Sequence, residues 1–282
     1  MPVSKNPWDI PEWNSIGREA ALARHLVGSG ITALGRANYA DKIGEYYTAF
    51  FSLSVGLERL AKLIQVADYA ISHNGQLPEE GIVRKFGHKL VALTDATDSV
   101  TQKYKLKLDY PRPTMAISEK IVECLDAFAD AGRGRYANFV ALGDPNLSAE
   151  EPIRKWWGEV AELILREHYY GKQAQERIEA RAKVVDTMMS PLAMVLHINE
   201  TGEAMQDVLS SSIRTGQTGI VQQYGRYYAL TVVRWLAEVF SELSRFACYT
   251  HNVEAFFGVW EYFQTYTVSD NFLKKRKIWP LN

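Results

Sequence analysis

Arg245 and His251 are separated by five residues, FACYT, in a segment with helical periodicity. A histidine titrates near neutrality and can act as a general acid or base, and an arginine stays cationic. Cleavage of a phosphodiester by a neighbouring 2′-hydroxyl needs a proton carrier and a fixed cation, and it needs no metal. These two residues are therefore the candidate catalytic pair.

Helix geometry limits what this pair can do within one chain. At about 100° and 1.5 Å per residue, His251 lies about 120° around the helix from Arg245 and about 9 Å along it. Arg245 points away from the apolar stripe of this helix, and His251 lies at its edge. The two side chains do not converge in a straight helix, so they are either polar residues of an outer face or half of a site that a second chain completes.

The rest of the chain must supply the elements that position such residues. Apolar residues recur three and four positions apart, and no segment alternates as a half-buried β-strand would. The sequence therefore predicts an all-α multi-helix bundle of about eight to ten helices, with a polar loop over 210–219. The predicted helices cover 43–71, about 84–104, about 115–131, two segments of 153–198 that break near Gly171 or Pro191, 220–250, and 253–267.

The segment GDPNLSAEEP, residues 143–152, is the clearest internal boundary. Its Gly and Pro residues end one helical pattern, and Pro152 suits the first turn of the next helix. We expect an N-terminal helical region over 1–145 and a C-terminal helical region over 146–282. A single domain with a long loop at this point is the alternative.

Composition excludes several classes of protein. The 282 residues carry 32 basic and 33 acidic side chains, a formal net charge of −1, so nucleic acid could be held only by a local basic patch. Two cysteines make no disulfide framework. The start, MPVSKNPWDIPEWN, lacks the apolar run of a signal peptide, and no window is apolar enough to span a bilayer. The sequence predicts a cytoplasmic protein without membrane association.

Motifs for cofactors and metals are missing. No GxxxxGK[ST], GxGxxG, HExxH or GxSxG is present, and no cofactor is predicted. His197 with Glu200 and His251 with Glu254 have a spacing that could contribute to a metal site on two helices. The full carboxylate set of a di-iron bundle cannot be assembled, so we interpret them as ordinary polar pairs and predict no metal.

Residues 46–95 resemble the HEPN superfamily of small helical domains. A helix with Gly-x-Glu-x-x-x-Lys leads through a polar loop to Gly-His-x-Leu-x-x-Leu. The matching residues are Gly56, Glu58, Lys62, Gly87, His88, Leu90 and Leu93. The resemblance implies a HEPN-like bundle with additional helices that forms a homodimer. Many members are metal-independent RNases of toxin–antitoxin, CRISPR or phage-defence systems, and others are inactive partners or scaffolds.

Active HEPN proteins carry Arg and His separated by four to six residues, which Arg245 and His251 satisfy. The resemblance implies a bacterial endoribonuclease of defence or toxin–antitoxin type, with His251 as general acid/base and Arg245 stabilising the phosphate. Phe246 departs from the family, which tends to have a polar residue after the arginine. The alternative is a catalytically inactive HEPN-like interaction or sensor module that binds a protein or nucleotide. A helical metalloprotein that uses the two His–Glu pairs is a third class.

Two further groups could contact partners. Arg133, Arg135, Tyr136 and Asn138 lie in AGRGRYANFVALG and could bind RNA or a nucleotide through charge and stacking. The alternative for them is a helix-capping turn with surface charges. The adjacent tryptophans 156 and 157 point about 100° apart on a helix, so one of them could serve an oligomer interface.

Overall fold

The computed structural model describes residues 6–130, 134, 136–143 and 151–281 of the chain. Helices dominate these residues. Their only strands form a short antiparallel hairpin of β1 (His197–Ile198) and β2 (Ala204–Met205). The predicted all-α, multi-helix fold is therefore confirmed.

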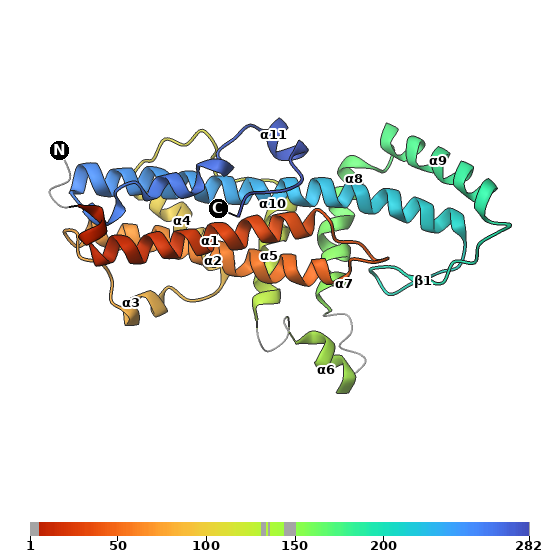
Figure 1. The fold of residues 1–282 in the computed structure, drawn as a ribbon, viewed down its shortest axis with the longest axis horizontal. Coiled ribbons are helices and arrows are strands. Elements are labelled where there is room, and N and C mark those ends of the chain that lie inside the picture. Colours follow the sequence, from red (N-terminus) through yellow and green to blue (C-terminus); the bar gives the residue numbers. More distant parts are fainter. Residues whose placement is uncertain (1–5, 131–133, 135, 144–150, 282) are drawn as a thin grey trace.

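Five helices form the body of the molecule, in which three long helices run side by side and two shorter ones pack against them (Figure 1). They are α1 (Pro11–Leu34), α2 (Gly44–Ser72), α4 (Leu90–Lys103), α5 (Ala116–Ala129) and α10 (Val208–His251). The helices α1 and α2 approach each other closely, because a Cβ on Gly30 would lie 2.9 Å from the backbone nitrogen of Leu53. Only glycine fits there, because backbone atoms cannot turn aside as a flexible side chain can.

Shorter elements surround this body. They are η1 (Pro7–Asp9), α3 (Glu80–Lys85), α6 (Ala137–Gly143), α7 (Pro152–Trp156), the π-helical turn η3 (Trp157–Ala161), α8 (Glu162–His168), α9 (Gln173–Met189), η4 (Glu254–Phe256), η5 (Val259–Tyr266) and α11 (Asp270–Lys275). Pro152 opens α7 as predicted, and the Glu151 side chain caps it by accepting a hydrogen bond from the Arg154 amide at 2.8 Å. The predicted break near Gly171 is confirmed, with this residue at φ 68° between α8 and α9.

One end of α10 extends past the body together with α9 (Figure 1). We call residues 173–216 the arm. It contains α9, the β1–β2 hairpin and the first turns of α10. Within the arm, α9 packs so closely on α10 that a Cβ on Gly216 would lie 2.3 Å from Cγ2 of Ile178.

A single hydrophobic core holds the body together. It runs in sequence from Ile16 to Trp279, so both predicted regions, 1–145 and 146–282, contribute to it. Trp156 and Trp157 are both buried, with 1% and 3% of their surface exposed, so neither serves an interface as the sequence suggested. The π-helical turn that starts at Trp157 changes the local rotation, and the two indoles enter the core together.

The polar loop predicted over 210–219 is wrong, because α10 begins at Val208 and includes this whole segment. The Asp207 side chain caps the helix by accepting a hydrogen bond from the Ser210 amide at 2.7 Å. The serines and glycines of the segment favour a loop locally, but contact with α9 outweighs that preference.

The helix predicted over 253–267 is also wrong. Asn252 adopts the left-handed conformation at φ 54°, which ends α10 at His251. Gly258 at φ 72° then separates η4 from η5, and both are 3₁₀ segments. The chain thereby folds back, and η5 packs along α10.

The helix predicted over about 84–104 is two helices, α3 and α4. Gly87, at φ 78°, turns the chain between them. The first turn of α4 is capped from another helix, because the Leu90 amide donates to the Asp126 carboxylate of α5.

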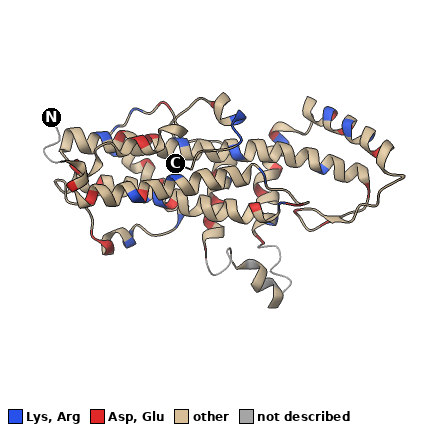
Figure 2. Cartoon of the chain, viewed as in Figure 1, with Lys and Arg blue, Asp and Glu red and all other residues tan. Residues whose placement is uncertain are grey.

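Both signs of charge are interspersed along the helices, as Figure 2 shows. This pattern fits the net charge of −1. Within the described ranges, no helix is both long and apolar enough to cross a membrane.

Candidate functional site

Arg245 is occupied by contacts within its own chain. Its Nη1 lies 2.6 Å from Oε1 of Glu242, one turn earlier on α10. Its guanidinium carbon lies 5.9 Å from the centre of the Trp260 ring in η5. The side chain is still 42% exposed, so a ligand could reach it only in competition with Glu242.

His251 lies in a different environment at the end of α10. Its ring contacts Phe246 edge-on, with 4.9 Å between the ring centres. It lines an open cavity of about 720 Å³ that also has Glu12, Glu79 and Glu254 in its wall. Arg245 does not line this cavity, and no hydrogen bond joins it to His251 in the part of the chain that the structure describes. Three carboxylates would repel a phosphate, so the cavity does not by itself favour RNA.

The second predicted group is only partly described. Arg133 and Arg135 lie outside the described residues. Tyr136 is 52% exposed and contacts Phe139, with 6.5 Å between the ring centres. The Asn138 side chain makes a hydrogen bond within the chain, because its Nδ2 donates to the hydroxyl of Tyr47 at 2.8 Å.

Tyr47 links this group to the start of α7. Its hydroxyl donates to Oε1 of Glu151 at 2.6 Å. Burial and the Glu151 carboxylate raise the pKa of Tyr47 to about 12, because both disfavour the phenolate. Tyr47, Asn138 and Glu151 line a cavity of about 280 Å³, where the phenol is a stable hydrogen-bonding group.

Three residues that carry the HEPN resemblance meet on the surface. Nδ1 of His88 lies 2.8 Å from Oε1 of Glu58, and Nζ of Lys62 lies 2.9 Å from the same oxygen. The His88 side chain is 76% exposed, whereas Glu58 and Lys62 are largely covered. Sequence spacing placed these residues on two elements, and the fold joins them through one carboxylate oxygen.

The two His–Glu pairs do not form a common site. His197 contacts Tyr39 edge-on at 5.9 Å, and Glu200 turns into the protein interior. Among the residues with a described placement, no group of three or more His, Cys, Asp or Glu side chains is arranged to hold a metal ion.

The sequence did not reveal a buried ion pair at the base of the arm. Nη2 of Arg214 lies 2.8 Å from Oε2 of Glu200, whose side chain is fully buried. The Arg214 guanidinium stacks on Trp157, with 3.7 Å from its carbon to the ring centre. Tyr46 of α2 donates to Glu200 at 3.3 Å and accepts from the Trp157 indole at 2.9 Å. Burial, followed by the charge of Glu200, raises the pKa of Tyr46 well above its ordinary value.

This pair fixes the arm to the rest of the molecule, because both of its members lie in the arm and their partners lie outside it. The Glu200 carboxylate follows β1, and Arg214 belongs to the first turns of α10. Their partner Tyr46 belongs to α2 of the body, and Trp157 belongs to the π-helical turn η3 beside it. A lone Glu in HINE gives no sign of such burial, so no pattern in the sequence could have indicated it.

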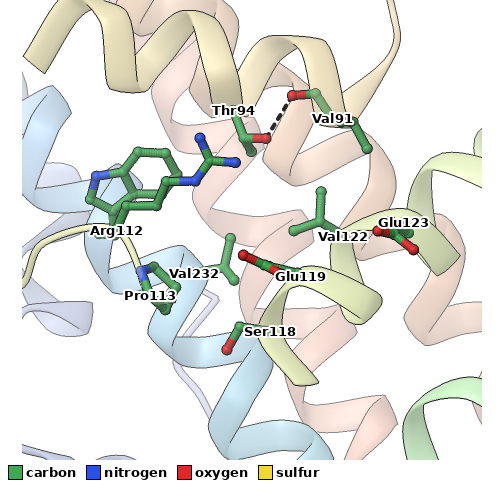
Figure 3. Close-up of a pocket in the computed structure, with 10 residues that line it drawn as sticks. Val91, Thr94, Arg112, Pro113, Ser118, Glu119, Val122, Glu123 and Val232 are labelled. Atoms are coloured by element: carbon green, nitrogen blue, oxygen red, sulfur yellow. Dashed lines mark hydrogen bonds between the residues drawn. The ribbon is translucent and has the colours of Figure 1, made fainter. Parts of the chain in front are cut away.

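A small cavity between α4, α5 and α10 was also not predicted (Figure 3). It has a volume of about 140 Å³. Val91, Val122, Val232 and Trp235 supply an apolar wall, and Arg112 with two glutamates of α5 supplies charge. The signal in the sequence was Arg112 between two prolines, a rigid setting that the pattern marked only as a helix break.

Comparison with known proteins gives no match to this chain among family models, curated proteins or solved structures. The HEPN resemblance therefore stays a prediction that rests on the motif residues. The functional argument depends on the geometry of the chain itself.

Proposed function

We propose that this protein is a HEPN-like, homodimeric interaction module of bacterial defence or toxin–antitoxin type, which works by binding and not by RNA cleavage. The arm carries this proposal. It carries large apolar side chains that are 41–83% exposed. We call them the arm patch: Val184, Val185, Met188, Met189, Leu192, Met194, Leu196 and Ile198.

The size of the arm patch is what an interface needs. Fully burying one such side chain removes roughly 60–120 Å² from water, so eight of them at this exposure leave an apolar area on the order of 500 Å². The largest patch on a typical monomer is about 300–600 Å² and is often functional. It is large enough to form the centre of an interface that buries about 800 Å² per partner.

The chemistry of the arm favours a second copy of the chain as the occupant. α9 carries three cations and three anions, at Glu176, Arg177, Glu179, Arg181, Lys183 and Asp186. An arm with balanced charge and an apolar patch is complementary to itself, and a two-fold axis would place the same patch on both subunits. The methionines of the patch adapt their shape readily when such surfaces pack together.

The test is the molar mass in solution, measured by light scattering during size exclusion. We expect a dimer for the wild type and a monomer for Leu192→Glu, because a buried carboxylate has no partner in the interface. Leu142→Glu is the matched control, since Leu142 on α6 is as exposed as Leu192, at 82%, but lies outside the arm. A monomeric wild type, or a dimer that Leu192→Glu leaves intact, would overturn the proposal.

RNA cleavage by Arg245 and His251 is the second candidate. The exposure of Arg245 favours it, because RNA could reach this side chain, whereas the carboxylates in the cavity beside His251 would repel a phosphate. The reaction would need a second chain that brings its own residues to this end of α10. Wild type and His251→Ala are incubated with total RNA in EDTA, and fragments made by the wild type alone support this activity. Absence of fragments, with no toxicity on overexpression, supports the binding module.

A further inference from the structure

The cavity in Figure 3 is partly open and combines a buried apolar wall with separate opposite charges. Trp235 and Val232 of α10 are 1% and 2% exposed, and Val122 of α5 is 8% exposed. The volume of about 140 Å³ is close to the roughly 150 Å³ of an engineered apolar cavity that binds benzene. One branched or aromatic side chain therefore fills it.

The two buried hydroxyls of the cavity can only accept hydrogen bonds from a ligand. Thr94 donates to the carbonyl of Val91 at 2.8 Å, the bond drawn in Figure 3. Ser118 lies 3.2 Å from Thr231, whose own proton goes to the carbonyl of Tyr228 at 2.7 Å. Ser118 must then donate to Thr231. The free lone pairs of Thr94 and Ser118 favour a ligand that carries N–H donors.

Arg112 is the cation of the cavity, and the chain holds it in place. Its Nη2 lies 2.8 Å from Asp95, and its guanidinium carbon lies 5.5 Å from the centre of the Trp235 ring. The Glu238 carboxylate accepts the backbone amides of Asp109 and Tyr110 at 2.7 Å each, which fixes the loop that carries Arg112. The other guanidinium N–H groups make no hydrogen bond within the described residues. They can therefore donate to a ligand carboxylate.

Glu119 and Glu123 supply the opposite charge from α5. Both line the cavity together with Arg112, yet no ion pair joins either of them to Arg112 in the described part of the chain. Glu123 is neutralised by Lys120 one turn earlier. Among the residues that the structure describes, Glu119 has no such partner, so its carboxylate is available to a ligand cation.

We propose that this cavity binds a free apolar α-amino acid of about the size of leucine. The side chain occupies the wall of Val122, Val232 and Trp235. The ligand carboxylate pairs with Arg112, and its ammonium pairs with Glu119. This site lies apart from the arm and gives the module a small-molecule ligand to sense.

The test is calorimetric titration of the full chain with L-leucine and two truncated analogues. 4-Methylpentanoate lacks the ammonium, and isoamylamine lacks the carboxylate. We expect leucine to bind, and each analogue to bind about tenfold more weakly, because each loses one charge-assisted contact. Asparagine, of similar size but with a polar side chain, should not bind.

Two variants assign the contacts. In Glu119→Gln, leucine and 4-methylpentanoate should bind alike, and in Arg112→Gln, leucine and isoamylamine should bind alike. Glu162→Gln on α8 is the control and should bind as the wild type does. Glu119 is exposed, so its variant tests the site even if Arg112→Gln fails to fold. No leucine binding at millimolar concentrations, or binding that both variants leave unchanged, would overturn the proposal.

Discussion

Leucines in the body and in the arm have opposite environments. Leu230, Leu236 and Leu243 of α10 are completely buried, whereas Leu192 and Leu196 of the arm are each 82% exposed. The body buries its apolar residues within one chain. The arm does not, so its sequence makes physical sense when another surface covers it. The contrast separates residues that stabilise the fold from residues that are available for binding.

The largest expected effect tests the junction between these regions. Arg214→Met removes the partner of the buried Glu200, and we expect a loss of about 3–5 kcal/mol in the free energy of unfolding. Arg245→Met breaks the exposed pair with Glu242, and we expect a loss below about 1 kcal/mol. Urea denaturation at neutral pH measures both. Equal losses would mean that the two ion pairs do not differ as their burial indicates.

A second comparison uses one substitution in both regions. Leu230→Ala opens a cavity in the body and should cost about 2–5 kcal/mol. Leu196→Ala should change the stability by less than about 0.5 kcal/mol when it is measured in the monomeric Leu192→Glu background. A large loss from Leu196→Ala in that background would show that the arm patch packs within its own chain.

A smaller difference in stability is expected between two variants that add a methyl group at a helix contact, Gly30→Ala and Gly216→Ala. In Gly30→Ala the new methyl group meets the backbone of α2, and we expect a loss of about 1–3 kcal/mol. In Gly216→Ala it meets only the side chain of Ile178, which can shift, and the gain in helix propensity offsets part of the cost. Thermal unfolding of the two variants ranks them, and a reversed order would contradict the contacts described at these positions.

The smallest effect is a dependence on pH where α8 packs against α10 of the body. His168 stacks on Tyr224 with 3.5 Å between the ring centres, and burial lowers the pKa of its imidazole. The stability from neutral His168 is present above pH 6.5, the ordinary value, and is lost as the pH falls through the lower folded-state pKa. The wild type should therefore lose more stability than His168→Gln between pH 7 and pH 5. Parallel denaturation curves for the two proteins would contradict this.

Periodicity predicted α2 and α5 well because packing there follows the helical repeat, but it did not predict α1, over Pro11–Leu34. The predicted helix over 43–71 matches α2, and the one over about 115–131 matches α5 within two residues. Polar composition led to the wrong prediction of a loop over 210–219, where contact with α9 stabilises a helix. Aromatic periodicity led to the wrong prediction of one helix over 253–267. Asn252 and Gly258 adopt positive φ angles there, and the periodic pattern does not indicate them.

The candidate sites were less predictable than the fold. Glu58, Lys62 and His88 carry the family resemblance, and they meet in the structure, although motif spacing did not predict that contact. It could not anticipate that Glu200 would find Arg214, or that Arg112 would face α5, because those contacts depend on where a hairpin and a loop return to the bundle. Contacts between residues far apart in the sequence produce no local periodic pattern from which they could be predicted.

The length of α10 has a consequence for the two candidate functions. This helix has 44 residues and therefore spans on the order of 65 Å, with the arm at its first residues and His251 at its last. Antiparallel pairing of two arms would put the two His251 residues at opposite extremes of an elongated particle. Parallel pairing would place the two copies of α10, and with them the two His251 residues, at the same end of the particle. The distance between spin labels near the two copies of His251 would thus show whether the proposed dimer could present a shared catalytic groove.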